Sequence, residues 1–447
     1  QVAPALQALP VISLITDNTH LFGAGSGIYV NAEGHGHAWE RESTAELIAP
    51  DTTGFSVNAG LRIRGGWSRH GYNPKHSFRL FFRSEYGDAK LHYPLFGDEG
   101  VAVYDKIDLR TAQNYSWNFD GWNGQHNTFL RDVFSRDLQR AMGQPYTRSR
   151  YYHLYLNGMY WGLYQTQERA EARYAESYWG GDKEEYDVIK VNTENYAYAV
   201  EATDGNTDNW YTIYQLCQQG FSSNANFYRL WGRDENGHPN GTEVYVDIEN
   251  LIDYMLVIFY TGNYDAPTSS FGQNNGCNNF YAIDNRADKG KGFRFFSHDA
   301  EHSLLKDAIH PGHGLYEDRV NLTLRTDDSK MEDPGLYGFH PQWLHHKLCA
   351  NKEYRMLFAD HVAEHMTGNG IMTPPRAQAL LLSRKQAINE AIVAESARWG
   401  DAQHEPARTK NDDWLPEVND ILNEYLPFRT TIVLGQLRRA GLYNENL

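Results

Sequence analysis

Asp247-Ile-Glu-Asn-Leu-Ile-Asp-Tyr-Met-Leu-Val-Ile-Phe-Tyr260 is the stretch of sequence that best indicates the fold. Its apolar residues recur at three- and four-residue spacing and are numerous enough for the helix to be fully buried. Asp247 can accept a hydrogen bond from the first turn and so begin the helix. We therefore predict a central core helix here.

The chain before this helix is rich in strand and turn signals. Alternation in Leu61-Arg-Ile-Arg64, a break at Gly65-Gly66 and a β-rich run over residues 76–83 predict a hairpin with a glycine-rich connection. Two further runs flank Asn157-Gly158, a pair typical of type I′ turns, and predict a second hairpin. Helical spacing over residues 130–142 interrupts this β-rich part.

The chain after the core helix becomes mostly helical. Beyond Gln342, helical patterns cover residues 354–365, 375–398 and 422–439, with glycine and proline at the joints. We therefore predict an α+β fold. Its β-rich part, with inserted helices, spans residues 1–245, and its mostly helical part spans residues 246–447.

The composition excludes several classes of function. The 447 residues include 41 Lys and Arg against 57 Asp and Glu, and the formal net charge of −16 repels phosphate backbones. No apolar run approaches the roughly 18 residues that a membrane span needs. The three cysteines form no C-x-x-C pair, which argues against a zinc ribbon. We expect neither a nucleic-acid partner nor a membrane span.

The balance of residues resembles that of secreted bacterial proteins. Tyrosine, tryptophan, asparagine and glycine are abundant, and acidic residues exceed basic ones. The first residues, Gln1 to Pro4, show no basic region followed by an apolar stretch, so we expect that any signal peptide has been removed. The prediction is a mature chain that is secreted or held at the cell surface.

Three polar segments after the core helix form the pattern with the most chemical content. Asp265 leaves the helix, Asn278-Asn279 precedes a strand, and Asp299-Ala-Glu301 ends the next strand. Phosphoryl transfer uses such a set, because one carboxylate accepts the proton of the attacking hydroxyl while an amide and a second carboxylate hold metal ions. Mg²⁺ suits these few hard oxygen ligands. Each residue taken singly is typical of an ordinary turn.

The same segment contains a competing motif. His298-Asp-Ala-Glu301-His302 matches the H-x-x-E-H pattern of inverted zincins, which are zinc metalloproteases. That motif needs both histidines on adjacent turns of one helix, whereas the preceding residues read as a strand that ends at Ser297. Structural roles for the two histidines are favoured.

A glycine-rich connection upstream could contact phosphates. Arg64-Gly-Gly-Trp-Ser68 lies between two predicted strands, and Lys75 begins the second of them. A phosphate-contacting lysine needs a carboxylate partner, for which Glu168 is the candidate. The alternatives are an ordinary tight turn for the loop and a solvated helix start for Glu168 with Arg169.

Several segments, in their order along the chain, resemble the CotH-type kinases, a family named for the bacterial spore-coat kinase and related to protein kinases of the secretory pathway. The resemblance covers nearly the whole chain. No single segment identifies the family, but all of them together, in this order, do. They are Gly27–Val30 with Trp39–Arg41, Leu61–Ser68 with Lys75–Arg79, Glu85–Phe96, Leu130–Asp132, Asn157–Tyr164 with Glu168-Arg169, Gly262–Asp265, Asn278-Asn279, Asp299 and Ala394–Asp401.

The resemblance implies an atypical protein-kinase-like fold with its functional residues. Asp265 would be the catalytic acid, and Lys75 with Glu168 would contact phosphates. The predicted metal ligands are Asn279, Asp299 and Glu301. Lys90 lies in another matching segment and is the alternative lysine. The implied cofactors are ATP and Mg²⁺, with Mn²⁺ or Ca²⁺ as alternatives. The implied substrate is a Ser or Thr hydroxyl of an extracellular or cell-surface protein.

Two departures from the family's pattern keep a second function open. Ser297 stands where members often carry an acid, and a longer polar insert, Pro267–Gly276, follows Asp265. Both changes bear on metal binding. The main alternative to a kinase is therefore a catalytically inactive, kinase-like binding or structural module of the cell surface, and the zinc metalloprotease is a minor one.

Overall fold

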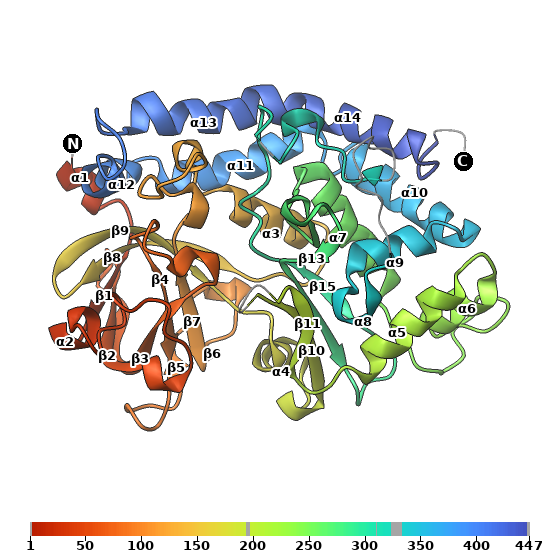
Figure 1. The fold of residues 1–447 in the computed structure, drawn as a ribbon, viewed down its shortest axis with the longest axis horizontal. Helices are drawn as coiled ribbons and strands as arrows, with labels where there is room; N and C mark the ends of the chain where they lie inside the picture. Colours follow the sequence, from red (N-terminus) through yellow and green to blue (C-terminus); the bar gives the residue numbers. More distant parts are fainter. Residues whose placement is uncertain (1, 194–196, 310, 323–332, 445–447) are drawn as a thin grey trace. The chain divides into compact units, whose positions relative to one another are not determined.

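The computed structural model describes residues 2–193, 197–309, 311–322 and 333–444, and its strands and helices confirm the α+β class (Figure 1). The chain forms two compact units from separated segments. Unit 1 comprises Gln1–Leu130, Thr147–Arg169 and Leu382–Asn419, and unit 2 comprises Arg131–Tyr146, Ala170–Leu381 and Asp420–Leu447. The units do not divide at residue 245, the predicted boundary, because a composition change marks local structure and not which segments pack together.

Unit 1 is built on a closed β-barrel. Its strands, in the order in which neighbours are hydrogen-bonded, are β1 (Val11–Ile15), β2 (Arg41–Ile48), β3 (Gly54–Arg64), β4 (Ser77–Phe81), β7 (Lys106–Arg110), β9 (Met159–Gln167) and β8 (Ser149–Leu156). Both predicted hairpins are present, as β3–β4 and β8–β9. Positive φ angles of 49° at Asn157 and 80° at Gly158 fit the predicted type I′ turn.

Smaller elements complete unit 1. They are α1 (Val2–Leu6), α2 (Asn18–Phe22), the short strands β5 (Leu91–His92) and β6 (Val103–Tyr104), α12 (Ile392–Trp399) and most of α13 (Leu415–Asp420). The helix predicted over 375–398 is two helices, α11 (Pro374–Ile388) and α12, because residues 389–391 form a turn. Trp399 of α12 belongs to the apolar core of the barrel, with residues such as Leu61, Phe78 and Leu154.

Unit 2 combines an antiparallel sheet with most of the helices. The sheet order is β11 (Ala199–Asp204), β10 (Tyr186–Asn192), β14 (Phe280–Asn285) and β15 (Arg294–Ser297), and a two-stranded hairpin joins β12 (Thr268–Ser269) to β13 (Gly276–Cys277). The helices are α3 (Arg131–Ala141), α4 (Ala172–Trp179), α5 (Asp208–Gln219), α6 (Asn224–Leu230), α7 (Ile248–Thr261), α8 (Gly335–Gly338), α9 (Pro341–Leu348), α10 (Lys352–Met366) and α14 (Leu426–Arg439).

The predicted core helix is α7. The Asp247 carboxylate accepts a hydrogen bond from the Asn250 amide at 3.0 Å, which confirms the predicted N-cap. Every described residue of α7 except Glu249 is buried. The helix packs against β15, α3, α9, α10 and α14, so it is the centre of unit 2.

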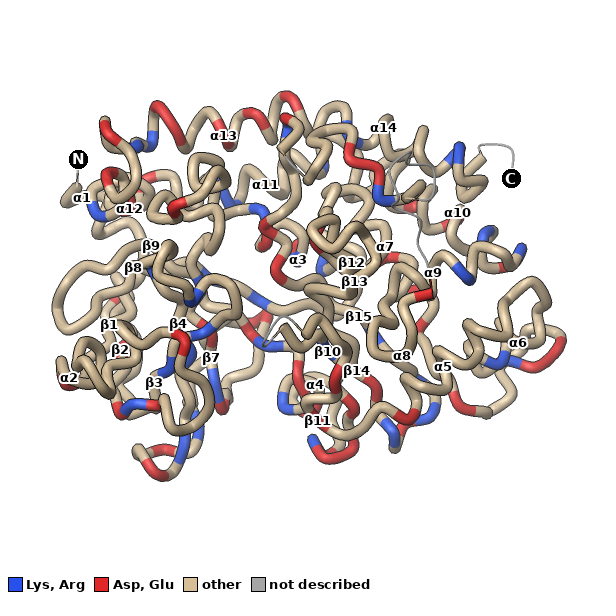
Figure 2. Tube along the Cα trace, viewed as in Figure 1, with Lys and Arg blue, Asp and Glu red and all other residues tan. Residues whose placement is uncertain are grey.

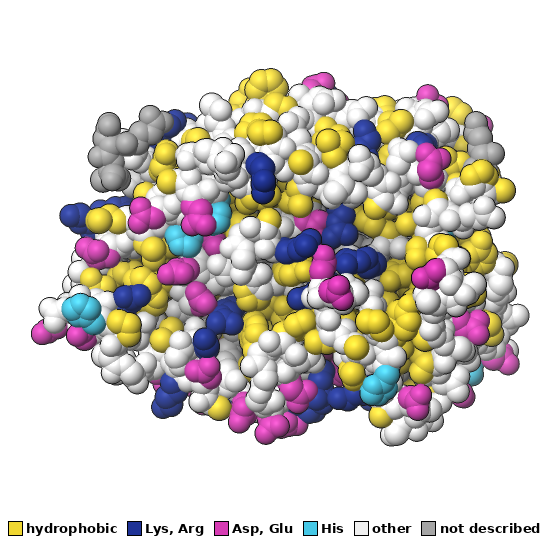
Figure 3. All heavy atoms as spheres, turned by 180° about the vertical axis from the view of Figure 1, so that it is seen from behind, with side chains coloured by type: hydrophobic (Ala, Val, Ile, Leu, Met, Phe, Trp, Pro, Cys, Tyr) yellow, Lys and Arg dark blue, Asp and Glu magenta, His cyan; other side chains and the backbone are white. Residues whose placement is uncertain are grey.

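Charged residues of both signs are mixed along the chain (Figure 2). On the face drawn in Figure 3, Lys and Arg side chains lie among Asp and Glu side chains. Within the described residues, no helix combines the length and apolar character that crossing a bilayer requires.

Candidate functional site

Asp265 follows the C-terminal end of α7. Gly262 ends the helix in the left-handed conformation, with a φ of 61°, and this turns the chain toward the sheet. The Asp265 carboxylate then accepts hydrogen bonds from Ser269 Oγ at one oxygen and from Asn279 Nδ2, 2.9 Å away, at the other. Only 7% of Asp265 is exposed, so its position is fixed and shielded from water.

The sheet register brings the predicted metal-binding residues to the same place. Strands β14 and β15 are antiparallel, and Phe280 lies opposite Ser297. The residues just before β14 and just after β15 therefore share one edge of the sheet. Asn279 and Asp299, with φ angles of 46° and 53°, both turn in the left-handed region at that edge. Asp265 and Asp299 are close enough for the charge on Asp299 to raise the pKa of Asp265.

The surroundings of Asp265 raise the pKa of its carboxyl group, so that it holds its proton more tightly than an ordinary aspartate does. Burial is the main cause that raises the pKa of Asp265, and Asp299 adds to it. His302 and hydrogen bonds from Ser269 and Asn278 act in the opposite direction. Burial lowers the pKa of His302, whereas the two aspartates raise it.

Helix α3 fixes the turn that carries Asp299. Gln139 donates to the Phe295 carbonyl at 2.6 Å and accepts from the Ser297 amide at 2.9 Å. The Asp132 carboxylate accepts from the Ala300 amide at 3.1 Å and pairs with Arg136 at 2.8 Å. The sequence prediction did not include these supporting residues, because polar side chains inside a helix give no local sign of the strand that they contact.

The insert after Asp265 is an ordered hairpin. Arg319, which is fully buried, donates to Ser270 Oγ, Asn274 Oδ1 and the Thr268 carbonyl, each at 2.7 Å. These bonds hold the loop of the β12–β13 hairpin, from which Ser269 reaches Asp265. The insert therefore supports the site, and Arg319 is a second residue that the sequence prediction did not include.

Carboxylate, amide and hydroxyl oxygens, the ligand types that a hard cation such as Mg²⁺ prefers, lie in the segments around the acids. Asp299 supplies a carboxylate, and Glu301 lies buried two residues further along the same turn. Among the atoms that the structure describes, Asn278 Oδ1 and Ser297 Oγ are buried oxygens with no hydrogen-bond partner. A buried oxygen without a partner is costly unless something else contacts it. These residues are the ones that could hold the ion.

The zincin geometry is not formed. Residues 298–303 contain turns and no helix, so His298 and His302 do not occupy adjacent helical turns. His298 packs edge-on against Tyr281, with ring centroids 4.8 Å apart, and His302 Nδ1 hydrogen-bonds to the Tyr264 hydroxyl at 3.0 Å. Within the described residues, two groups of three side chains lie close enough together to share a metal ion, and neither group contains a residue of the H-x-x-E-H motif. The histidines have the structural roles that the strand context predicted.

Lys75 lies in the connection between β3 and β4 and is completely buried in unit 1. Its ammonium donates to Glu395 Oε1 at 2.6 Å and to the Leu163 carbonyl at 2.9 Å, and it faces the rings of Phe129 and Tyr164. Burial lowers the pKa of Lys75 to about 8, although Glu395 opposes the shift. The predicted pair with Glu168 is wrong, because the partner comes from α12, 320 residues further along the chain.

The other residues predicted to contact a nucleotide have structural partners. Glu168 Oε2 accepts from the backbone amide and the guanidinium of Arg148, both at 2.9 Å. Arg64 donates to Asp108 at 2.9 Å, and Ser68 is buried close to Gly65. The connection between β3 and β4 is a longer loop that contains a short 3-10 helix, Trp67–Arg69, and not a tight turn, and its role in nucleotide binding stays a prediction.

The comparison with known families adds an independent observation. The model of one family, described as CotH kinase protein, matches residues 61–433 of the chain. The matched range includes Lys75, Glu395, Asp265, Asn279 and Asp299. A search of curated proteins found no match. The resemblance inferred from the ordered segments is therefore confirmed.

Proposed function

Because the chain belongs to the CotH kinase protein family, we propose that it transfers the γ-phosphate of ATP to Ser or Thr hydroxyls of a protein partner outside the cell. One observation carries this proposal. Asp265 is buried, is held through both oxygens by Ser269 and Asn279, and lies within electrostatic reach of Asp299. Phosphoryl transfer depends on such positioning more than on covalent chemistry by the protein.

Asp265 is our candidate for the group that accepts the proton of the substrate hydroxyl. A raised pKa makes it a stronger base than an ordinary aspartate, and its two hydrogen bonds fix the direction of its lone pairs. Asp299, Asn279, Glu301 and the unpaired oxygen of Asn278 would hold Mg²⁺. When bound, the ion would neutralise charge on the phosphates.

Lys75 is our candidate cation for nucleotide binding in unit 1. Glu395 holds its ammonium in one place, as a carboxylate holds the phosphate-contacting lysine in protein kinases. Because Lys75 has no exposed surface, contact with a phosphate requires neighbouring side chains to move first.

The test is nucleotide-dependent stabilisation combined with phosphotransfer. With ATP and Mg²⁺ at about 100 times the dissociation constant, the wild type should gain about 2.7 kcal/mol in free energy of unfolding. Asp299→Asn should fold but lose most of this gain, because it removes the charge that holds the ion. Asp360→Asn, at an exposed position of α10, is the matched control and should behave as the wild type.

Phosphotransfer tests the role of Asp265. With labelled ATP, Asp265→Asn should retain nucleotide binding but lose phosphotransfer, because it removes the proton acceptor and not the metal ligand. A wild type with no response to ATP with either Mg²⁺ or Mn²⁺ would contradict the kinase proposal.

That result would favour the second candidate, a kinase-like module that binds a surface partner without catalysis. One observation supports it: both oxygens of Asp265 already accept hydrogen bonds within the protein, and little of the side chain is exposed. A purely structural aspartate would have the same surroundings.

A further inference from the structure

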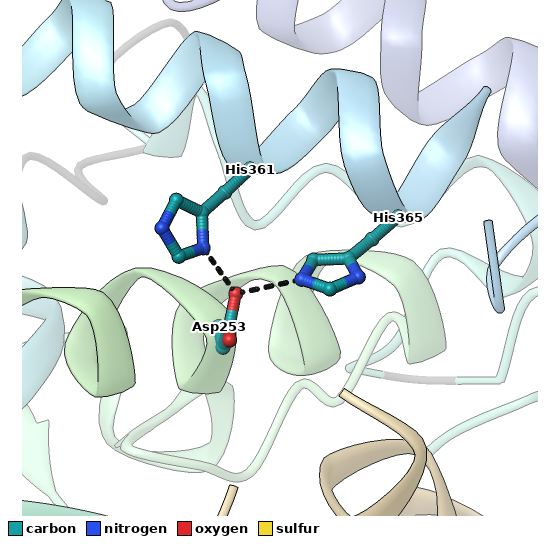
Figure 4. Close-up of side chains that lie close together, drawn as sticks. All are labelled: Asp253, His361 and His365. Carbon is teal, nitrogen blue, oxygen red and sulfur yellow. Dashed lines mark hydrogen bonds and ion pairs between the residues drawn. The ribbon is translucent and has the colours of Figure 1, made fainter. Parts of the chain in front are cut away.

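A group of three side chains in unit 2, separate from the acids at the sheet edge, has the composition of a transition-metal site (Figure 4). Asp253 projects from α7, and His361 and His365 project from α10 toward it. Two histidines four residues apart lie on one face of a helix, so both rings can reach one ion. All three ligand atoms lie within 4.8 Å of one another.

We propose that Asp253, His361 and His365 bind a first-row transition-metal ion, for which Zn²⁺ is the probe, and that the ion ties α10 to α7. Two imidazoles and one carboxylate suit Zn²⁺ and its neighbours better than Mg²⁺ or Ca²⁺, which prefer oxygen ligands. The site therefore differs in metal preference from the one proposed around Asp299. Three protein ligands leave a fourth position for water.

The distances are close to those that coordination requires. Tetrahedral bonds of about 2.0–2.1 Å place ligand atoms about 3.3 Å apart. Asp253 Oδ1 lies 3.2 Å from His365 Nε2 and 2.6 Å from His361 Nδ1. With respect to Asp253, His365 already lies at this separation, whereas His361 has to retreat by about 0.7 Å to reach it. His361 is the most exposed of the three, at 13% of its side chain, and so is the easiest to move.

Surrounding side chains orient the carboxylate in the way that metal sites require. Gln144 Nε2 donates to Asp253 Oδ2 at 2.7 Å and leaves Oδ1 facing the histidines. Asn250 Nδ2 donates in turn to Gln144 Oε1 at 3.0 Å, and Asn250 Oδ1 accepts from the Phe295 amide at 2.6 Å. Such supporting hydrogen bonds fix ligand orientation in metalloproteins.

The charges around the group favour a cation. Asp253 is 1% exposed, and a carboxylate so deeply buried needs compensating positive charge. The exposed carboxylates of Glu249 and Glu364 also lie close enough to act on His361 electrostatically. A divalent ion would balance this negative charge and could enter from the side of His361, the most exposed of the three side chains.

The first measurement is the metal affinity of the full-length chain. Protein stripped with a chelator should bind one Zn²⁺ per chain in competition with a chelating dye. Substituting Gln144→Leu removes the supporting hydrogen bond and should weaken binding by roughly 10- to 100-fold. His361→Gln and His365→Gln, which remove ligands, should weaken it at least as much. His346→Gln, at an exposed position of α9, is the matched control and should bind as the wild type.

A second measurement needs no variant. Co²⁺ bound to the wild type should give the intense visible absorption of a tetrahedral ion, and Zn²⁺ should displace it while Mg²⁺ does not. The proposal is overturned if the wild type binds no Zn²⁺, if the ligand variants bind it as the wild type does, or if the cobalt spectrum is that of the hexa-aqua ion. The group would then be an ion pair between the two helices.

Discussion

Replacing Lys75 with methionine removes one half of an ion pair that has no contact with solvent. Lys75 and Glu395 are both 0% exposed, and the nitrogen and oxygen lie 2.6 Å apart. Methionine fills nearly the same volume, so the main change is the loss of a charge. Glu395 Oε2 keeps its bond from the Leu163 amide at 2.7 Å, but Oε1 keeps no partner among the described residues.

The expected cost follows from this burial. A buried charge whose partner is removed costs about 3–5 kcal/mol in free energy of unfolding, whereas an exposed pair contributes about 0–1 kcal/mol. Lys75→Met should therefore destabilise the protein by about 3–5 kcal/mol. Lys410→Met is the matched control in the same unit, because Lys410 pairs with Glu390 at 3.3 Å and that carboxylate is 64% exposed.

A double variant separates the charge effect from packing. In Lys75→Met with Glu395→Gln, the new amide is neutral and can still accept from the Leu163 amide, so no unpaired charge remains. Most of the lost stability should return, because replacing both members of a buried ion pair by uncharged groups of similar volume often changes the free energy of unfolding little.

Urea denaturation of the four proteins, followed by circular dichroism, gives the free energies of unfolding. The reasoning is refuted if Lys75→Met costs no more than Lys410→Met. It is also refuted if the double variant is less stable than Lys75→Met, because the cost would then not come from the unpaired carboxylate.

Three further predictions test other parts of the structure. Gly162→Ala should destabilise the barrel by more than about 1 kcal/mol, because φ is 130° and the added Cβ would lie 2.7 Å from Glu395 Oε2; an unchanged melting temperature would contradict this. Burial raises the pKa of Asp284 to about 6, so its contribution to stability is greatest below the unfolded pKa and is lost as pH rises through about 6. Asp284→Asn should thus raise the free energy of unfolding by about 2–3 kcal/mol over the wild type at pH 7 and by little at pH 4. Equal increases at both pH values would show that burial of the charged carboxylate is not the cause. The double variant His298→Gln with His302→Gln should be less stable by about 1 kcal/mol in free energy of unfolding, because the hydrogen bond to Tyr264 is lost, and ATP with Mg²⁺ should still stabilise it. The zincin alternative would return if the wild type carried one zinc per chain and a peptidase activity and the double variant lost both.

The sequence by itself determined the local elements and the order of the acids. The Asp247 cap, the spacing within α7 and the Asn157-Gly158 turn are short-range signals, since each depends on residues within a few positions of one another. Asp265, Asn279 and Asp299 could be singled out because they follow a predicted helix, precede a predicted strand and end the next strand, in the order of residues that phosphoryl transfer uses. The family resemblance also needed only the order of short segments.

Only the tertiary structure decided which distant residues pair. Glu395 lies on the same buried face of α12 as Ile392 and Trp399, and this spacing in the sequence indicates a buried acid. No local pattern, however, identifies Lys75 as its partner. The grouping of Asp253 with His361 and His365 depends likewise on how α10 packs against α7. The physical reason is that local patterns fix backbone conformation, whereas contacts between distant segments follow from burying apolar surface of the whole unit.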